Sequence, residues 1–179
     1  MGDLRIGMIG TGMMGCEHIK NVMGIPEARI TAISDPNDDP RGWARLTMDG
    51  RYGDVAEFTD HRALLDSGLV DAVLVSSPNF THKAVLDDVF AADIPVLVEK
   101  PMCTTVEDCV SVVNAQSQRS AITWVGLEYR YMPTIAALLQ QLHGGAVGNL
   151  RMFSVREHRF PFLVKVGNWN RFSRNTGGT

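Results

Sequence analysis

The chain has 179 residues, 45% of them hydrophobic and 21% charged, with a net charge of −3 at pH 7. This is the composition of a globular protein, and the lack of a basic surplus argues against nucleic acid or an anionic membrane as a partner. The three cysteines, Cys16, Cys103 and Cys109, have no C-x-x-C spacing, so we expect no disulfide framework, no metal site and a reducing, cytoplasmic location.

Short, continuously apolar runs recur along the first 126 residues and predict strands that are buried on both faces. They are LRIGMIG (4–10), ARITAIS (28–34), a shorter run near VAEF (55–58), DAVLVSS (71–77), IPVLVEK (94–100) and SAITWVG (120–126). The first run is too short to span a bilayer, and no signal-peptide cleavage region follows it. Segments with apolar residues at helical spacing separate the runs. Strand alternating with helix predicts an α/β fold with a doubly wound parallel sheet.

The pattern changes after residue 126. MPTIAALLQQLHGGAVGN (132–149) predicts a helix that ends at Gly144 and Gly145, and the alternation in LRMFSVREHRF (150–160) predicts a strand. One helix and one strand are too few for an independent core. We therefore expect residues 127–179 to begin an α+β second domain that this chain leaves incomplete.

The first chemical motif, GTGMMG, lies between the first predicted strand and the first predicted helix. Gly10, Gly12 and Gly15 form a G-x-G-x-x-G pattern there, with Met13 and Met14 between the last two glycines. The first glycine permits the tight turn, the second lets pyrophosphate approach the backbone, and the third lets the helix pack on the strand. The motif in this position indicates a Rossmann-type dinucleotide site made by these five residues.

An acid stands where such a site requires one. Asp35 ends the second predicted strand, 20 residues beyond Gly15, where a carboxylate can accept hydrogen bonds from both adenosine ribose hydroxyls. The same charge repels a 2′-phosphate, so NAD is favoured over NADP, although Arg41 and Arg45 nearby leave NADP open. The competing interpretation is that the glycines only shape a turn and Asp35 only caps a helix, and methyltransferases share part of the pattern.

The segment SSPNFTH follows the fourth predicted strand, at the carboxyl edge where open α/β sheets bind ligands. Ser76, Ser77 and Asn79 can offer hydrogen bonds to the cofactor ribose, but Pro78 and Asn79 are equally suited to beginning the next helix. His82 completes the segment on the first turn of that helix, where capping or packing is a more common role for histidine than proton transfer. We include all five among the candidate cofactor residues.

LVEKPM ends the next predicted strand at the same edge. The ammonium of Lys100 could hydrogen-bond a substrate hydroxyl there and stabilise alkoxide character as hydride leaves the carbon. By position alone, a lysine after a strand is more often solvated, with Glu99 as its surface partner.

In their order and spacing, IGMIGTGMMGCEHIKN, Asp35, SSPNFTH, VEKP and VGLEYRYMP resemble the glucose-fructose oxidoreductase / inositol dehydrogenase (Gfo/Idh/MocA) family. In that family a two-domain oxidoreductase binds NAD or NADP on an N-terminal Rossmann domain and oxidises or reduces a sugar, cyclitol or related polyol. The resemblance implies that Lys100 is catalytic, that Glu99 lies near the nicotinamide and that the bond before Pro101 is cis. Methyltransferases lack the E-K-P element.

The resemblance also covers residues beyond 126. It implies that Glu128 and Arg130 line the nicotinamide side of the cleft, although Arg130 could equally form a salt bridge between domains. NWNRFSRNTGGT resembles the segment that precedes the family's substrate-site helix, which makes Trp169 and Arg171 candidate substrate residues.

Family members continue for well over a hundred residues and supply an aspartate and a histidine that act with the lysine. No histidine of this chain stands at that motif position. The resemblance therefore implies the N-terminal portion of an NAD-dependent dehydrogenase acting on the CH–OH group of a small sugar or polyol. It implies a homo-oligomer when complete and poor activity at this length. A non-catalytic dinucleotide-binding or sensor module is the alternative.

Overall fold

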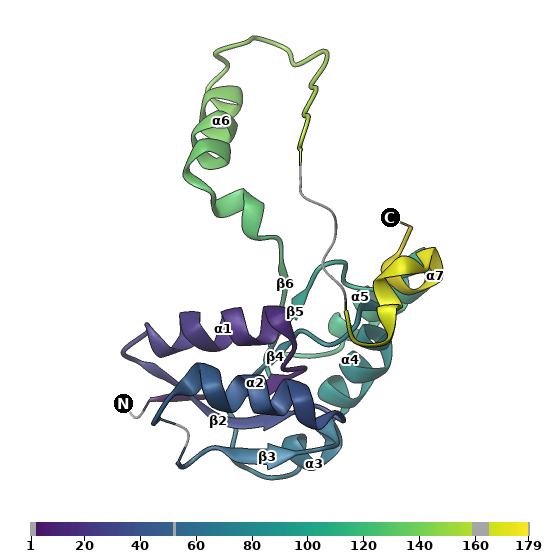
Figure 1. Cartoon of the computed structure of the whole chain (residues 1–179). Helices are drawn as coiled ribbons and strands as arrows, with labels where there is room; N and C mark the ends of the chain where they lie inside the picture. Colours follow the sequence, from purple (N-terminus) through teal and green to yellow (C-terminus); the bar gives the residue numbers. More distant parts are fainter. Residues whose placement is uncertain (1–2, 52, 159–164, 179) are drawn as a thin grey trace. The chain divides into compact units, whose positions relative to one another are not determined.

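A computed structural model describes residues 3–51, 53–158 and 165–178 (Figure 1). Within these residues, six strands form one parallel sheet in the order β3-β2-β1-β4-β5-β6. The strands are β1 (Leu4–Ile9), β2 (Ala28–Ser34), β3 (Ala56–Phe58), β4 (Ala72–Val75), β5 (Val96–Glu99) and β6 (Thr123–Gly126). The strand order reverses between β1 and β4, as in a doubly wound Rossmann sheet. The predicted fold class is confirmed.

Helices connect successive strands and cover the sheet on both faces. They are α1 (Met13–Met23), α2 (Asp38–Met48), α3 (His61–Leu65), η1 (Asn79–Thr81) with α4 (His82–Ala91), and α5 (Val106–Gln116). Ile19 of α1 and Met48 of α2 share a buried cluster with Met8 of β1, whereas Leu64 of α3 and Leu86 of α4 lie in a second cluster on the other face. Because neighbouring side chains of a strand point to opposite faces, the continuous apolar runs supply both clusters.

The chain divides into two compact units. One contains residues 1–126 together with 169–179, and the other contains residues 127–168. The sequence placed all of 127–179 in the second domain, but the terminal segment, with the end of η3 (Val166–Arg171) and α7 (Ser173–Thr176), groups with the sheet. Asn79 explains part of this grouping, because its amide donates to the carbonyl of Thr176 at 3.2 Å.

Residues 127–168 contain η2 (Glu128–Tyr131) and α6 (Pro133–His143). The predicted helix is confirmed and ends just before Gly144. The strand predicted at 150–160 is wrong for residues 150–158, which form no strand, and residues 159–160 lie outside the described part of the chain. A strand requires a neighbour to pair its backbone groups, and no other strand is present among the described residues after β6. No helix in the described part of the chain is both long and apolar enough to cross a bilayer.

Candidate functional site

The glycine-rich turn joins β1 to α1, and each of its glycines meets a different steric condition. Gly10 has φ +87°, and a Cβ there would lie 2.5 Å from the amide nitrogen of Ser77. A Cβ at Gly15 would lie 2.3 Å from the carbonyl oxygen of Gly10, so side chains are excluded at both positions. A Cβ at Gly12 would have no atom within 4 Å. The turn is thus closed at its first and third glycines and open at the second.

The open position lies at the beginning of α1. Gly12 is the N-cap residue, no side chain caps the helix, and its first turn contains no acid. The first amide groups of a helix point outward with a partial positive charge, which suits an anion. Met13 and Met14, the first two residues of α1, are about two-fifths exposed. The hydroxyl of Thr11 is buried and makes no hydrogen bond within the described part of the chain. This turn fits the pyrophosphate of a dinucleotide.

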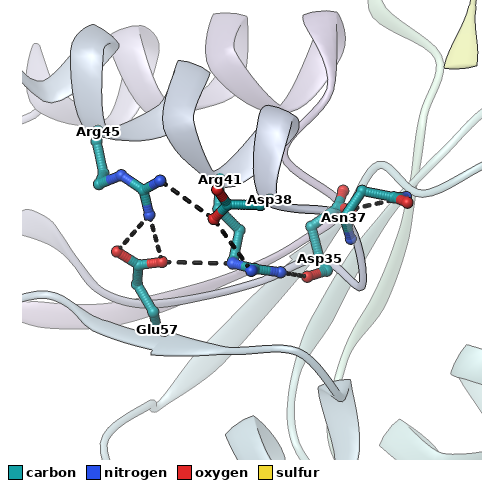
Figure 2. A network of polar contacts seen from close by, with 6 residues as sticks. All are labelled: Asp35, Asn37, Asp38, Arg41, Arg45 and Glu57. Atoms are coloured by element: carbon teal, nitrogen blue, oxygen red, sulfur yellow. Dashed lines mark hydrogen bonds and ion pairs between the residues drawn. The ribbon is translucent and has the colours of Figure 1, made fainter.

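Asp35 connects the glycine-rich turn to the end of β2. It is only 8% exposed, and its Oδ2 accepts from the backbone amide of Thr11 at 3.0 Å while Oδ1 accepts from that of Asn37 at 3.0 Å. Asn37, rather than Asp35, is the N-cap residue of α2. Figure 2 shows Arg41 of α2 beside Asp35, where it donates to the backbone carbonyl. A carboxylate has about four acceptor positions, so capacity remains for ribose hydroxyls.

The polar side chains of SSPNFTH bond to protein groups. The Ser76 hydroxyl donates to the carbonyl of Gly10 at 2.7 Å, and the hydroxyls of Ser77 and Thr81 lie 2.7 Å apart. Pro78 precedes η1 and its carbonyl accepts from the amide of Thr81. With Asn79 bonded to the terminal segment, these side chains hold the loop in shape, a role that the sequence analysis did not assign to them.

His82 is fully buried and bridges two loops. Its Nδ1 lies 2.9 Å from the carbonyl oxygen of Pro101, and its Nε2 lies 2.9 Å from that of Ser77. The side chain therefore ties the SSPNFTH loop to the turn that carries Lys100. A ring without exposed surface cannot contact a cofactor in this arrangement, which favours the packing role expected for a histidine at this position.

Glu99 and Lys100 end β5 at the same edge of the sheet. Glu99 is 9% exposed; its Oε1 lies 2.8 Å from Nε2 of His18, and its Oε2 accepts from the backbone amide of Lys100 at 3.2 Å. Burial raises the pKa of Glu99, but the hydrogen bond and charge of His18, together with the backbone amide and charge of Lys100, lower it more, so the pKa of this carboxyl lies below its ordinary value. Lys100 is exposed, and the Lys100–Pro101 bond is cis, as the resemblance implied.

The sequence analysis gave His18 no role. The signal available was its position on α1, three residues after Gly15, so the two residues share one face of the helix. Because the face that includes Gly15 packs on the sheet, a polar residue one turn further along it lies near the strand ends.

The terminal segment contributes an aromatic pair. The ring of Trp169 packs edge-on against Phe80 of the SSPNFTH loop, with centroids 6.3 Å apart. A Cβ at Gly177 would lie 3.5 Å from Pro101, so this segment also contacts the E-K-P turn. Trp169 is therefore near the SSPNFTH loop and Gly177 near the E-K-P turn, while Arg171 is exposed on the same segment.

Glu128 and Arg130 belong to the unit of residues 127–168, where both lie exposed on η2. In that unit, the Tyr129 hydroxyl donates to Glu157 at 2.9 Å. The cofactor role of Glu128 and the substrate role of Arg130 stay predictions.

Comparison with known proteins agrees with this geometry. Residues 4–127 match the family described as an oxidoreductase family with an NAD-binding Rossmann fold. The chain is 33% identical over 148 residues to inositol 2-dehydrogenase 1 of Saccharopolyspora erythraea, covering 82% of this chain and 43% of that protein. It is 27% identical to the rhizopine catabolism protein MocA of Rhizobium meliloti, covering 86% and 47%.

Solved structures give the same result. The myo-inositol dehydrogenase of Lactobacillus casei, solved with NAD(H) and myo-inositol, superposes with a TM-score of 0.74 at 28% identity, covering 82% of this chain and 43% of that one. The chain thus spans less than half the length of the relatives that it matches.

Proposed function

Because the chain belongs to the Gfo/Idh/MocA oxidoreductase family, with its NAD-binding Rossmann fold, we propose that it is the cofactor-binding part of a polyol dehydrogenase. The reaction would transfer a hydride between the nicotinamide of NAD and a hydroxyl carbon of a cyclitol, sugar or related small polyol. Relatives named inositol 2-dehydrogenases support this substrate class. By the same resemblance, we propose a cytoplasmic homo-oligomer for the complete protein.

One observation carries the proposal, namely the junction of the two motifs. Glu99 of E-K-P is hydrogen-bonded to His18 of α1, the helix that the glycine motif opens. Lys100 is bonded to the same carboxylate through its backbone amide. The lysine proposed for catalysis and the turn proposed for pyrophosphate are thus connected through a single side chain.

Each candidate residue of this chain has a separate role in the proposed reaction. The amides that open α1 bind pyrophosphate, and Asp35 accepts from the adenosine ribose. Lys100 holds the substrate oxygen by a hydrogen bond and stabilises negative charge that develops on it. Bound NAD supplies the hydride acceptor for oxidation and, in reduced form, the hydride donor for the reverse reaction.

Oxidation of CH–OH also releases the hydroxyl proton, which requires a base. Within the sheet unit, His18 is bonded to Glu99 and His82 is buried between two carbonyls. His61, the third histidine there, pairs with Asp88. By the family resemblance, which supplies a histidine to act with the lysine, we place the base outside the sheet unit.

The test has two parts. The 179-residue chain should bind NADH in a fluorescence titration, and it should not bind S-adenosylmethionine. In a full-length protein containing this chain, Lys100→Met should abolish NAD-dependent oxidation of myo-inositol or other cyclitols and leave the Kd for NADH unchanged. Lys83→Met, which removes an ion-paired lysine of α4, is the control and should keep its activity. Full activity of Lys100→Met would refute the catalytic role.

A further inference from the structure

Arg41 of α2 lies beside Asp35, the residue proposed for the adenosine ribose, and Arg45 lies at the other end of the same polar network (Figure 2). The guanidinium of Arg41 donates through Nη1 to the backbone carbonyl of Asp35. Arg45 follows one helical turn later. Arginine is well suited to phosphate because its planar group can donate two parallel hydrogen bonds. These are therefore the side chains from which a 2′-phosphate of NADP could gain affinity.

Both arginines form ion pairs with acidic side chains of the protein. Glu57 of β3 binds Nη1 of Arg45 with both carboxylate oxygens, at 2.8 and 2.6 Å, and its Oε2 lies 3.4 Å from Nε of Arg41. Oδ1 of Asp38 lies 3.2 Å from Nη2 of Arg41 and 3.3 Å from Nη2 of Arg45. The Arg41 side chain is only 12% exposed, so it is held inside this network.

The sheet register explains the position of Glu57. It pairs with Ile33 in the parallel β2–β3 ladder, two positions before the level of Asp35. Its neighbours Ala56 and Phe58 pack against the cluster on the α3–α5 face. Since alternate residues point to opposite faces, Glu57 points to the face that carries α2 and meets the two arginines there.

The ion pairs of this network balance one another. Asp38 and Glu57 contribute two negative charges, and Arg41 and Arg45 contribute two positive charges. The carboxylate of Asp35, whose backbone carbonyl binds Arg41, adds one further negative charge nearby. A 2′-phosphate would add about two more negative charges at pH 7. It would also have to displace Glu57 before it could bind Nη1 of Arg45.

We propose that Glu57 is a specificity-determining residue of the cofactor site, which favours NAD over NADP by holding Arg41 and Arg45 away from a 2′-phosphate. This inference rests on the proposed function and adds a second determinant to the carboxylate of Asp35. It assigns a role in cofactor choice to a strand, β3, that contributes no residue to the glycine motif.

The test compares NADH and NADPH, which differ only by the 2′-phosphate. Both are titrated into the 179-residue chain and into Glu57→Gln. The ratio of the NADPH Kd to the NADH Kd should fall by about tenfold in the variant, equivalent to about 1.4 kcal/mol. The fall should shrink as ionic strength rises, because the freed charges are partly exposed. In the triple variant Glu57→Gln, Arg41→Gln, Arg45→Gln, the ratio should return to the parent value or above it.

The matched control is Asp87→Asn, which also removes one carboxylate from an ion pair, with Lys83 on α4. Its Kd ratio should equal that of the parent. Asp38→Asn is a second variant, since its side chain is 76% exposed and tolerates change; it releases one contact from each arginine and should lower the ratio by about threefold, less than 1 kcal/mol. If Glu57→Gln does not unfold cooperatively, the Kd ratio of Asp38→Asn tests the proposal in its place.

An unchanged ratio of the NADPH Kd to the NADH Kd in the folded Glu57 or Asp38 variant would overturn the role of Glu57. An equal fall of this ratio in Asp87→Asn would do the same. In either case, NADH binding by the parent chain would still uphold the proposed function. A parent chain that binds neither cofactor would overturn both.

Discussion

Separate substitutions in the glycine-rich turn should distinguish cofactor binding from folding. A Cβ at Gly12 meets no atom within 4 Å, and the residue has φ −66°, which any side chain tolerates. Gly12→Val should therefore lower the free energy of unfolding by no more than about 1 kcal/mol, the cost of a poorer N-cap. Its side chain would fill the space proposed for pyrophosphate, so the Kd for NADH should rise at least about tenfold, or about 1.4 kcal/mol.

Gly15→Ala should instead lower the free energy of unfolding by more than Gly12→Val does. Its Cβ would lie 2.3 Å from the carbonyl oxygen of Gly10, whereas real Cβ contacts are at least 3.0 Å, so α1 and the turn must separate by about 0.7 Å. Over-packing of this kind costs about 1 to 3 kcal/mol. The loss should appear in the unfolding free energy of the variant whether or not NADH is added.

Urea unfolding followed by circular dichroism and titration with NADH measure the two quantities on the same samples. Gly53→Val is the control, since Gly53 also has no atom within 4 Å of its Cβ but lies outside the candidate site. Unchanged NADH affinity in folded Gly12→Val would refute the assignment of pyrophosphate to this turn. Parent-like stability of Gly15→Ala would refute the close packing of α1 on β1.

Two further predictions concern the residues that hold the E-K-P turn. The pKa of Glu99 is below its ordinary value of 4.5, so the unfolded chain binds more protons than the folded chain between these two pKa values. The stabilisation from ionised Glu99 should therefore be present above about pH 4.5 and be lost as pH falls through the lowered pKa. In urea unfolding, the difference in unfolding free energy between the parent and Glu99→Gln should become smaller as the pH falls. A difference that becomes larger would contradict the lowered pKa. His82→Ala should cost about 3 kcal/mol, because the link between the two loops loses its hydrogen-bond donor and a cavity remains in place of a fully buried ring. A loss below about 1 kcal/mol in the same assay would mean that His82 contributes little to stability.

The fold was predictable because each of its elements carries a local signal. Strands buried on both faces require apolar residues at nearly every position, and this pattern located five of the six strands in the described residues. The sixth, β3, includes Glu57 and was predicted from its place in the repeating pattern. The strand at 150–160 failed for a non-local reason, since alternation describes a face but supplies no neighbouring strand. In the same way, the sequence placed the serines of SSPNFTH at the sheet edge but did not indicate that their hydroxyls bond to Gly10 and Thr81.

The features that the sequence analysis missed are contacts between distant elements. His18 and Glu99 are 81 residues apart and form one hydrogen bond. Glu57 and Arg45 are only 12 residues apart, yet they belong to different elements, and the face on which Glu57 lies is decided by the alternation of a strand of three residues. A one-residue shift in that strand would turn Glu57 to the opposite face and release both arginines. By our proposal, the choice between NAD and NADP depends on the register of β3 as well as on the acid at the end of β2, and sequence proximity alone, which lacks this register, left NADP open at Arg41 and Arg45.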